Sequence, residues 1–405
     1  MNIVHVFAGR TRPARIRPRP LPRHGGFTLV ELLVALAVAA MLGLFIFVAY
    51  SAISVSGLRV SDESQAQNTA RVALTLLADD VARSGFMMNG PSGQNRCARL
   101  LVYNGKISSA VQTQWPISAV AQTSGGKVPG TSTPFGYAAP GGAQTDALSV
   151  FYADGFGVGN AALPGGVRVV RANNGTLENA ALFVANPSSF NRNDVDIVVL
   201  PSRNLCIRFQ VSQVGGAGNI VHSQGGSTDD INPPGGFDGV SNLANPPVDP
   251  PLTTADLQQA FVQNFGQISG ATGPLLVTYS IRPDPQNATT PDLYRTVVNA
   301  VGTVVSDVPV AQNVVLLHAL FAPLQQNGQI GAFVPWSTIE SNNQQGQVGA
   351  VQLAVLVQKP NTGNRTNVPA AISVLDETFT PPDQKHQYTL YTQTVYLRNI
   401  GWNAP

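Results

Sequence analysis

Residues 25–50 decide the fold: Gly25-Gly26-Phe27-Thr28-Leu29-Val30-Glu31 is followed by LLVALAVAAMLGLFIFVAY. The nineteen residues from Leu32 to Tyr50 contain neither a charged residue nor a proline. A helix of about 20 apolar residues is long enough to cross a bilayer. Glu31 stands at the head of this run, where a charge is costly unless it has a partner. The stretch therefore predicts a membrane helix whose acid takes part in assembly.

A basic leader precedes the apolar run, with no acidic residue among its arginines. These arginines favour a cytoplasmic amino terminus by the positive-inside rule, which places everything after about Tyr50 on the opposite side. The small Gly25-Gly26 pair offers a protease an unhindered, flexible strand. Cleavage there removes the leader but leaves the helix attached, whereas an ordinary signal peptide is cut after its apolar region. The leader arginines are Arg10, Arg12, Arg15, Arg17, Arg19 and Arg23.

The segment Gly26-Phe27-Thr28-Leu29-Val30-Glu31, with its leader and apolar run, resembles the prepilin signal of type IV pilins and type II secretion pseudopilins. The resemblance implies that a prepilin peptidase cuts after Gly26 and methylates the new amino terminus at Phe27. Glu31 would then be the fifth residue of the mature chain. The free Phe27 amine would be a cation, and Glu31 of an adjacent subunit is a suitable counter-charge. The alternative is that Glu31 only complements the helix macrodipole.

The leader also accounts for the positive net charge. The chain has 24 Lys and Arg against 22 Asp and Glu, so losing six arginines leaves 24 − 6 = 18 basic side chains and a net charge of 18 − 22 = −4. This balance argues against a nucleic-acid surface. Charged residues make up only 11% of the chain, with 39 glycines and 30 prolines. A cytosolic enzyme carries about a quarter, so the composition favours an exported, loop-rich β protein.

Two cysteines, Cys97 and Cys206, lie beyond the membrane segment. In an oxidising periplasm, two thiols in one domain are most simply a disulfide. Such a bridge closes a long loop, for which chain-entropy models give about 4–5 kcal/mol and measurements usually less. Two separate buried thiols are the alternative.

Beyond Tyr50 the pattern becomes amphipathic and predicts one helix from Phe27 to Arg83. Apolar side chains recur on one face at helical spacing, and the segment contains no proline. Gly43 and Gly57 are expected soft points, and Gly85 is expected to end the helix as its C′ residue. The apolar face comprises Ala66, Ala70, Ala73, Leu74, Leu77 and Val81.

From Leu100 onward, alternating or β-branched runs predict an antiparallel sheet packed on the amphipathic half of the helix, an α+β fold. Asn174-Gly175 is a tight-turn signal. The predicted strands are 147–152, 167–171, 195–200, 205–211, 275–281, 294–298, 314–321, 351–358 and 388–397. The expected organisation is a leader at 1–26, a membrane half of the helix at 27–50, a periplasmic half at 51–86 and a β-rich domain at 87–405.

Three tracts between the strands are rich in Gly, Pro, Ser, Asn and Gln and predict solvent-exposed loops, partly mobile. They are Gln122–Thr145, Gly215–Pro251 and Ser341–Gly349. The sequence leaves open whether the β-rich part breaks into two subdomains near Gly215–Pro251.

The resemblance narrows to the PilW-type minor pilins at three further places. They are the helix end Asp80-Val81-Ala82-Arg83-Ser84-Gly85-Phe86 followed by Cys97, the triplet Leu293-Tyr294-Arg295, and the closing strand Thr394-Val395-Tyr396-Leu397-Arg398-Asn399. The interval between Phe86 and Cys97 is longer than we expect for this family. That departure weakens the disulfide assignment.

The resemblance implies a structural subunit that helps to initiate the type IV pilus or sits at its tip, and through it serves twitching, adhesion or DNA uptake. Its partners would be other minor and major pilins, the prepilin peptidase and the inner-membrane assembly platform. The protein would lie in the inner membrane by a single helix, with its domain in the periplasm, and then in the extracellular pilus. The alternatives are a type II secretion pseudopilin and a tip adhesin whose polar loops bind a surface ligand.

The sequence offers no catalytic, cofactor or metal set, so we expect no enzyme. The histidines are scattered without a metal-ligand spacing, and neither a phosphate-binding loop nor a nucleophile elbow is present. The pairs Asp194-x-Asp196 and Asp229-Asp230 could donate oxygens to calcium. The simpler interpretation is that Asp194 and Asp196 flank the start of a strand and that Asp229-Asp230 lies in a solvated loop.

Overall fold

The computed structural model describes residues 28–86, 97, 99–105, 108–154, 166–172, 181–216, 218–223, 231–244, 247–267, 273–286, 290–325, 327–360 and 368–398. The chain divides into two compact units, Met1–Gly57 and Leu58–Pro405, which are taken separately below. Helix α1 contributes to both.

Helix α1 spans Leu29–Arg83, so the long helix predicted from the sequence is confirmed. The expected soft points Gly43 and Gly57 lie inside it without interrupting it. Gly85 has a φ of 70°, the left-handed conformation expected of a residue just past a helix end. Its amide donates to the carbonyl of Phe151 at 2.8 Å, which ties the end of the helix to a neighbouring strand.

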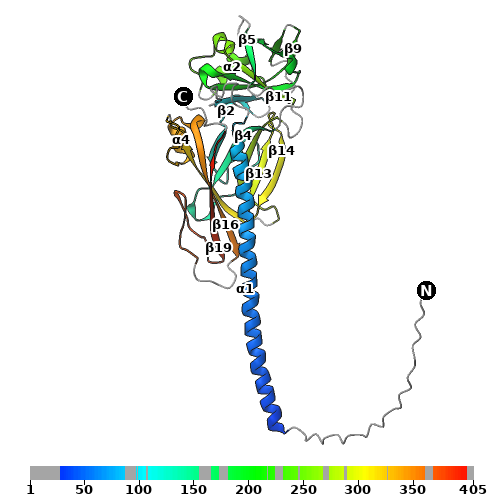
Figure 1. Cartoon of the computed structure of the whole chain (residues 1–405), viewed down its shortest axis with the longest axis vertical. Coiled ribbons are helices and arrows are strands. Elements are labelled where there is room, and N and C mark those ends of the chain that lie inside the picture. The colour runs from blue at the N-terminus through cyan, green and yellow to red at the C-terminus, as the bar shows by residue number, and fades with distance from the viewer. Residues whose placement is uncertain are drawn as a thin grey trace, which may run out of the picture. The chain divides into compact units, whose positions relative to one another are not determined.

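The predicted apolar face of α1 is buried in the second unit. Its six members pack in one apolar cluster with strands of two sheets (Figure 1). Three of the six are alanines, whose small side chains let a helix approach a sheet closely. The buried members are Ala66, Ala70, Ala73, Leu74, Leu77 and Val81.

A five-stranded antiparallel sheet forms one wall of this cluster. Its strand order is β14-β13-β12-β4-β3. The strands are β3 (Ile117–Ala121), β4 (Asp146–Asp154), β12 (Gly273–Pro283), β13 (Pro291–Val298) and β14 (Val304–Ala311).

A three-stranded antiparallel sheet, in the order β15-β16-β19, forms the other wall. The short hairpin of β17 and β18 packs on the far face of this sheet, where Phe379 lies against Tyr388 with ring centroids 5.0 Å apart. The strands are β15 (Val314–Pro323), β16 (Val348–Pro360), β17 (Ile372–Val374), β18 (Glu377–Phe379) and β19 (His386–Tyr396).

A nine-stranded sheet, in the order β2-β1-β8-β7-β11-β5-β6-β10-β9, encloses an apolar cluster of its own. It departs from the expected antiparallel pattern at β1 and β8, which pair in parallel. In Figure 1, α2, β5, β9 and β11 group together at one end of the second unit. The strands are β1 (Arg99–Asn104), β2 (Ser108–Gln114), β5 (Val167–Ala172), β6 (Leu182–Val184), β7 (Asp194–Leu200), β8 (Leu205–Gln210), β9 (Gln213–Gly215), β10 (Asn219–Val221) and β11 (Phe261–Gln267).

The α+β class and all the predicted strands are confirmed, with bounds that differ by a few residues. The predicted turn at Asn174-Gly175 lies outside the described residues. The described part of the chain also contains three short helices that were not predicted, α2 (Gly236–Leu243), α3 (Thr254–Gln258) and α4 (Trp336–Ser341).

The prediction that the three polar tracts are solvent-exposed loops is wrong for the second tract, which contains β10 and α2, whereas most residues of the first and third tracts are exposed or half-buried and only a few are buried. Phe135, in the first tract, is 2% exposed, and Phe237 of α2, in the second, is 1% exposed. Val348, at the end of the third, is fully buried. Burial of the isolated apolar residues in these tracts is favourable, and it brings the neighbouring polar residues close to the sheets. The second tract therefore packs on the nine-stranded sheet through α2.

Candidate functional site

Thr28 and Glu31 cap the first turn of α1. The Thr28 amide and hydroxyl donate to Glu31 Oε2 at 2.9 and 3.1 Å, and the Glu31 amide donates to Thr28 Oγ1 at 3.3 Å. This reciprocal pair is a capping box, which satisfies backbone N–H groups at a helix start. The Thr-x-x-Glu spacing could have revealed it from the sequence. Glu31 is exposed, so its carboxylate stays accessible to a neighbouring molecule, whereas Gly26 and Phe27 lie outside the described residues.

The first unit presents an uncovered apolar surface. Within the described part of the chain, α1 is the one helix that is long and apolar enough to cross a membrane. Every side chain from Thr28 to Ser54 is exposed, with Phe45 at 71% and Phe47 at 69%. An apolar surface of this extent marks a membrane or protein contact. It suits lipid tails or the apolar helices of other subunits.

Four polar side chains join α1 to the five-stranded sheet in the second unit. Asp80 is only 4% exposed. Its carboxylate accepts hydrogen bonds from Tyr152 Oη at 2.7 Å, Tyr279 Oη at 2.6 Å, Arg295 Nε at 2.7 Å and Arg295 Nη2 at 3.2 Å. The partners come from β4, β12 and β13. We refer to these four residues as the Asp80 cluster.

The charges of the Asp80 cluster are mutually satisfied. Burial, followed by the nearby Asp80 carboxylate, raises the pKa of Tyr152 and of Tyr279, so both phenols stay protonated and donate. Burial alone would lower the pKa of Arg295, but its hydrogen bond to Asp80 and the Asp80 charge outweigh this and raise it. Loss of one partner would leave a buried charge uncompensated, which is strongly destabilising. The cluster therefore fixes α1 at one position on the sheet.

Two sequence motifs that are separate in the chain meet in this cluster. Asp80 belongs to the helix-end motif and Arg295 to the Leu293-Tyr294-Arg295 triplet, whose Leu293 lies in the apolar cluster around α1. Tyr152 and Tyr279 lie in predicted strands, yet sequence reasoning missed them as partners of Asp80. They are 72 and 199 residues away along the chain, and no local pattern reports contacts at such a distance.

The closing-strand motif also packs near α1. Val395 and Leu397 are buried in the cluster that contains the apolar face of the helix, whereas Tyr396 between them is 63% exposed. The alternation places one side of β19 in the core and the other toward solvent.

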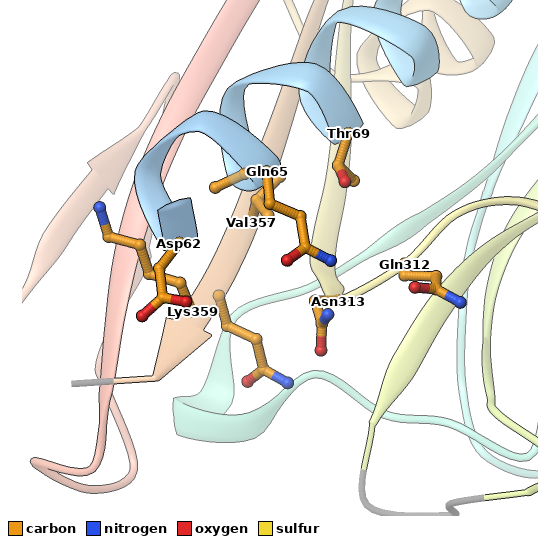
Figure 2. Close-up of a pocket in the computed structure, with 9 residues that line it drawn as sticks. Asp62, Gln65, Thr69, Gln312, Asn313, Val357 and Lys359 are labelled. Carbon is orange, nitrogen blue, oxygen red and sulfur yellow. The ribbon is translucent and has the colours of Figure 1, made fainter. Parts of the chain in front are cut away.

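A second polar attachment lies nearer the start of the buried half of α1. Glu63 pairs with Lys359 at the end of β16. Beside this pair, Figure 2 shows Gln65 and Thr69 of the helix facing Asn313 across a hollow of about 30 Å³. A space of this size holds one or two water molecules. The hollow is too small for an organic ligand.

Cys97 and Cys206 are joined by a disulfide, with their Cα atoms 5.2 Å apart. The bridge lies in an apolar cluster that includes Phe151 of β4 and Phe265 of β11. It connects the chain shortly after the helix to β8 of the nine-stranded sheet.

The candidate calcium residues do not form a cation site among the described residues, where no group of three or more His, Cys, Asp or Glu side chains could hold a metal ion. Asp194 accepts hydrogen bonds from Asn264 Nδ2 and the Asn191 amide, both at 2.7 Å. Asp196 is fully buried, and neither of its oxygens has a hydrogen-bond partner in the described chain. Burial, followed by the charge of Asp194, raises the pKa of Asp196 well above its usual value. The pair Asp229-Asp230 lies outside the described residues.

His318 of β15 lies between two carboxylates. Its Nδ1 is 2.8 Å from Asp146 Oδ2 and its Nε2 is 2.8 Å from Asp376 Oδ1. Burial lowers the pKa of His318, but the bonds and charges of the two aspartates outweigh burial and raise it to about 9. Asp376 lies in the turn between β17 and β18, so the charged imidazole holds this hairpin against the sheet.

Comparison with known families agrees with this architecture. Residues 21–47 match the family model of the prokaryotic N-terminal methylation motif. Together with the exposed apolar half of α1 and the packing of its other half on antiparallel sheets, this match fits a membrane-anchored pilin-like protein. Residues 278–399, which contain Tyr279 and Arg295, match the family model of the type IV pilus-assembly protein W. The two matches together support a PilW-family minor pilin of the type IV pilus. No curated protein and no solved structure matches it.

Proposed function

We propose that this minor pilin initiates pilus assembly or occupies the pilus tip, after cleavage between Gly26 and Phe27 and N-methylation of Phe27. It waits in the inner membrane with its domain in the periplasm and then joins other minor and major pilins through α1. The observation that carries the proposal is the exposed apolar surface of residues 28–54, headed by the accessible Glu31 carboxylate. The mechanism is packing, and it needs no catalytic group.

Glu31 acts twice in this scheme. In the separate subunit its carboxylate completes the capping box with Thr28. In the fibre it pairs with the Phe27 amine of an adjacent subunit. A subunit in the wrong axial register leaves that charge unpaired in apolar surroundings, at a cost of several kcal/mol. The pairing therefore sets the register.

Three variants separate the capping role of Glu31 from its charge. E31Q can still complete a capping box but is neutral; T28A removes the capping hydroxyl and keeps the charge; E31V removes both. We expect all three to enter the membrane. Because each 1.4 kcal/mol is a factor of ten, E31Q and E31V should enter pili at least about tenfold less well, and T28A within about twofold of wild type.

The readout is the amount of processed subunit in purified pili relative to the membrane, by immunoblot. E63Q is the matched control, because this helix carboxylate already pairs with Lys359 of its own chain. Wild-type incorporation of E31Q would refute the register mechanism. A defect in T28A equal to that of E31V would assign the effect to the cap instead.

The processing step has its own test. Mass spectrometry of the native protein should find a methylated Phe27 as the first residue. Replacing Gly26 by a bulky residue should leave the precursor with its leader, whereas normal processing of that variant would contradict the assignment of the cleavage site.

A further inference from the structure

Strand β19 is the outer strand of the three-stranded sheet. It pairs with β16 from His386 to Tyr396 without a register shift, and no described strand lies on its other side. Thr392, Gln393, Thr394 and Tyr396 are exposed. The described chain therefore leaves a long regular strand edge open.

The register shows which backbone groups face outward. The Leu397 amide donates to Gly349 at 2.9 Å, which places Leu397 in a hydrogen-bonded pair with its partner. Hydrogen-bonded and non-hydrogen-bonded pairs alternate along an antiparallel ladder. The alternate residues of β19 thus direct their N–H and C=O groups away from β16. These residues are Tyr388, Leu390, Thr392, Thr394 and Tyr396.

This edge lacks the protection that the outer strands β14, β3 and β9 carry. Natural sheets guard their outer strands with charges, prolines, bulges or short length. The outer strand β14 contains Asp307 and Pro309 and has two register shifts, while β3 has five residues and β9 has three. By contrast, residues 387–397 include no charged residue and no proline.

We propose that β19 accepts an extended, uncharged strand from another pilus subunit, which adds to the three-stranded sheet. Backbone hydrogen bonds give such strand addition its affinity, and side chains at alternate positions give specificity. Cross-strand neighbours of Thr and Tyr favour β-branched and aromatic residues. A neutral edge offers no counter-charge to a charged segment, so the incoming strand is uncharged.

The orientation of the sheet argues against a second copy of this chain as the partner. Two copies joined symmetrically through β19 pair antiparallel about a two-fold axis, which reverses one of them. β16, the neighbour of β19, runs beside residues 58–83 of α1 (Figure 1), and Lys359 at its end pairs with Glu63. Symmetric pairing would thus oppose the two helices, whereas subunits inserted in one membrane share one direction.

Residue-resolved hydrogen exchange on the full-length chain tests the proposal, which rests on the proposed function. Wild-type protein is compared in membranes and in purified pili. The outward amides of Leu390, Thr392 and Thr394 should exchange freely in membranes and at least about 100-fold more slowly in pili. The inward amides of Tyr391 and Gln393 should be slow in both. Fast outward exchange in pili overturns the inference and leaves the proposed function standing, whereas absence of the chain from pili overturns both.

Two variants at one position provide a second test. T392P removes one outward N–H without breaking the ladder to β16, a position where strands tolerate proline. T392A keeps that N–H. With equal processed protein in membranes and equal protease resistance, T392P should enter pili about tenfold less than T392A. Equal incorporation would overturn the proposal. A photo-reactive residue in place of Thr394 should cross-link to another subunit type, and a cross-link to a second copy would also overturn it.

Discussion

Replacing Asp80 by asparagine should loosen the attachment of α1 to its domain more than any neighbouring change on the helix. The variant keeps the shape of the side chain but removes the charge that Tyr152, Tyr279 and Arg295 all address. Arg295 then has an uncompensated positive charge, and its side chain is only 24% exposed. We therefore expect D80N to lower the free energy of unfolding.

The magnitude follows from the exposure of the pair. Breaking a buried ion pair by removing one partner costs about 3–5 kcal/mol. Because part of the Arg295 side chain reaches solvent, the lower end applies, about 3 kcal/mol. Asp79 supplies the matched control: it pairs with Arg83 at 2.9 Å, but its side chain is 59% exposed. D79N should cost no more than about 0.5 kcal/mol.

Urea titration of the full-length chain in detergent, followed by tryptophan fluorescence, measures both variants. Trp336 lies in the apolar cluster that holds α1 and Trp115 packs against it, so a change in their emission reports release of the helix. The double variant D80L/R295M should recover much of the loss seen in D80L, because no charge is left without a partner. Equal stabilities of D80N and D79N would show that the Asp80 cluster does not secure the helix.

Three further predictions concern the same unit. The pKa of His318 is raised to about 9 from an ordinary value near 6.5, so its contribution to stability is complete below about pH 6.5 and is lost as the pH rises through 9. The free energy of unfolding, measured by urea titration, should fall by up to about 3 kcal/mol between pH 6 and pH 10. The H318Q variant should lose this pH dependence, whereas the H386Q variant should keep it. Reduction of the Cys97–Cys206 bridge should lower the free energy of unfolding by up to about 4–5 kcal/mol. The C97S/C206S variant is the control, because reductant should not change its stability. G85A should cost about 1 kcal/mol because Gly85 has a φ of 70°, whereas G43A inside α1 should cost nothing; equal thermal shifts would contradict this.

Periodicity predicted the elements whose side chains repeat regularly. The apolar face of α1 and the strands β15 and β16 are long and consistently apolar, so one period dominates each. β14 escaped prediction because Asp307 and Pro309 interrupt its pattern, which only an outer strand tolerates. α2 escaped because its two glycines follow a Pro-Pro-Gly run and indicate a loop; burial of Phe237 and Val240 makes it a helix.

The residues of the candidate site likewise divide into those that a local pattern predicts and those that only the fold brings together. The signal at Gly26, Phe27 and Glu31 is local, so the sequence states it completely. The capping box at Thr28 is also local and could have been recognised from its spacing. The Asp80 cluster is different, because Arg295 lies 215 residues from Asp80 and reaches it only through sheet pairing. Single-sequence patterns contain no information about such pairing.

Most of the nine-stranded sheet is connected to the five-stranded sheet at a single hairpin. Asp154, which ends β4, is paired with Gly273, which begins β12. The chain thus leaves the five-stranded sheet and returns to it at adjacent points, and β5 to β11 with both intervening helices lie between those points. A short turn could close the same hairpin, but β1 would then lose its partner β8, and Phe151 of β4 would lose the apolar side chains of β7, β8 and β11 that cover it. Seven of the nine strands of this sheet, β5 to β11, are therefore an insertion at one hairpin, and the pairing of β1 with β8 together with the Cys97–Cys206 bridge ties that insertion back to the segment that follows the helix.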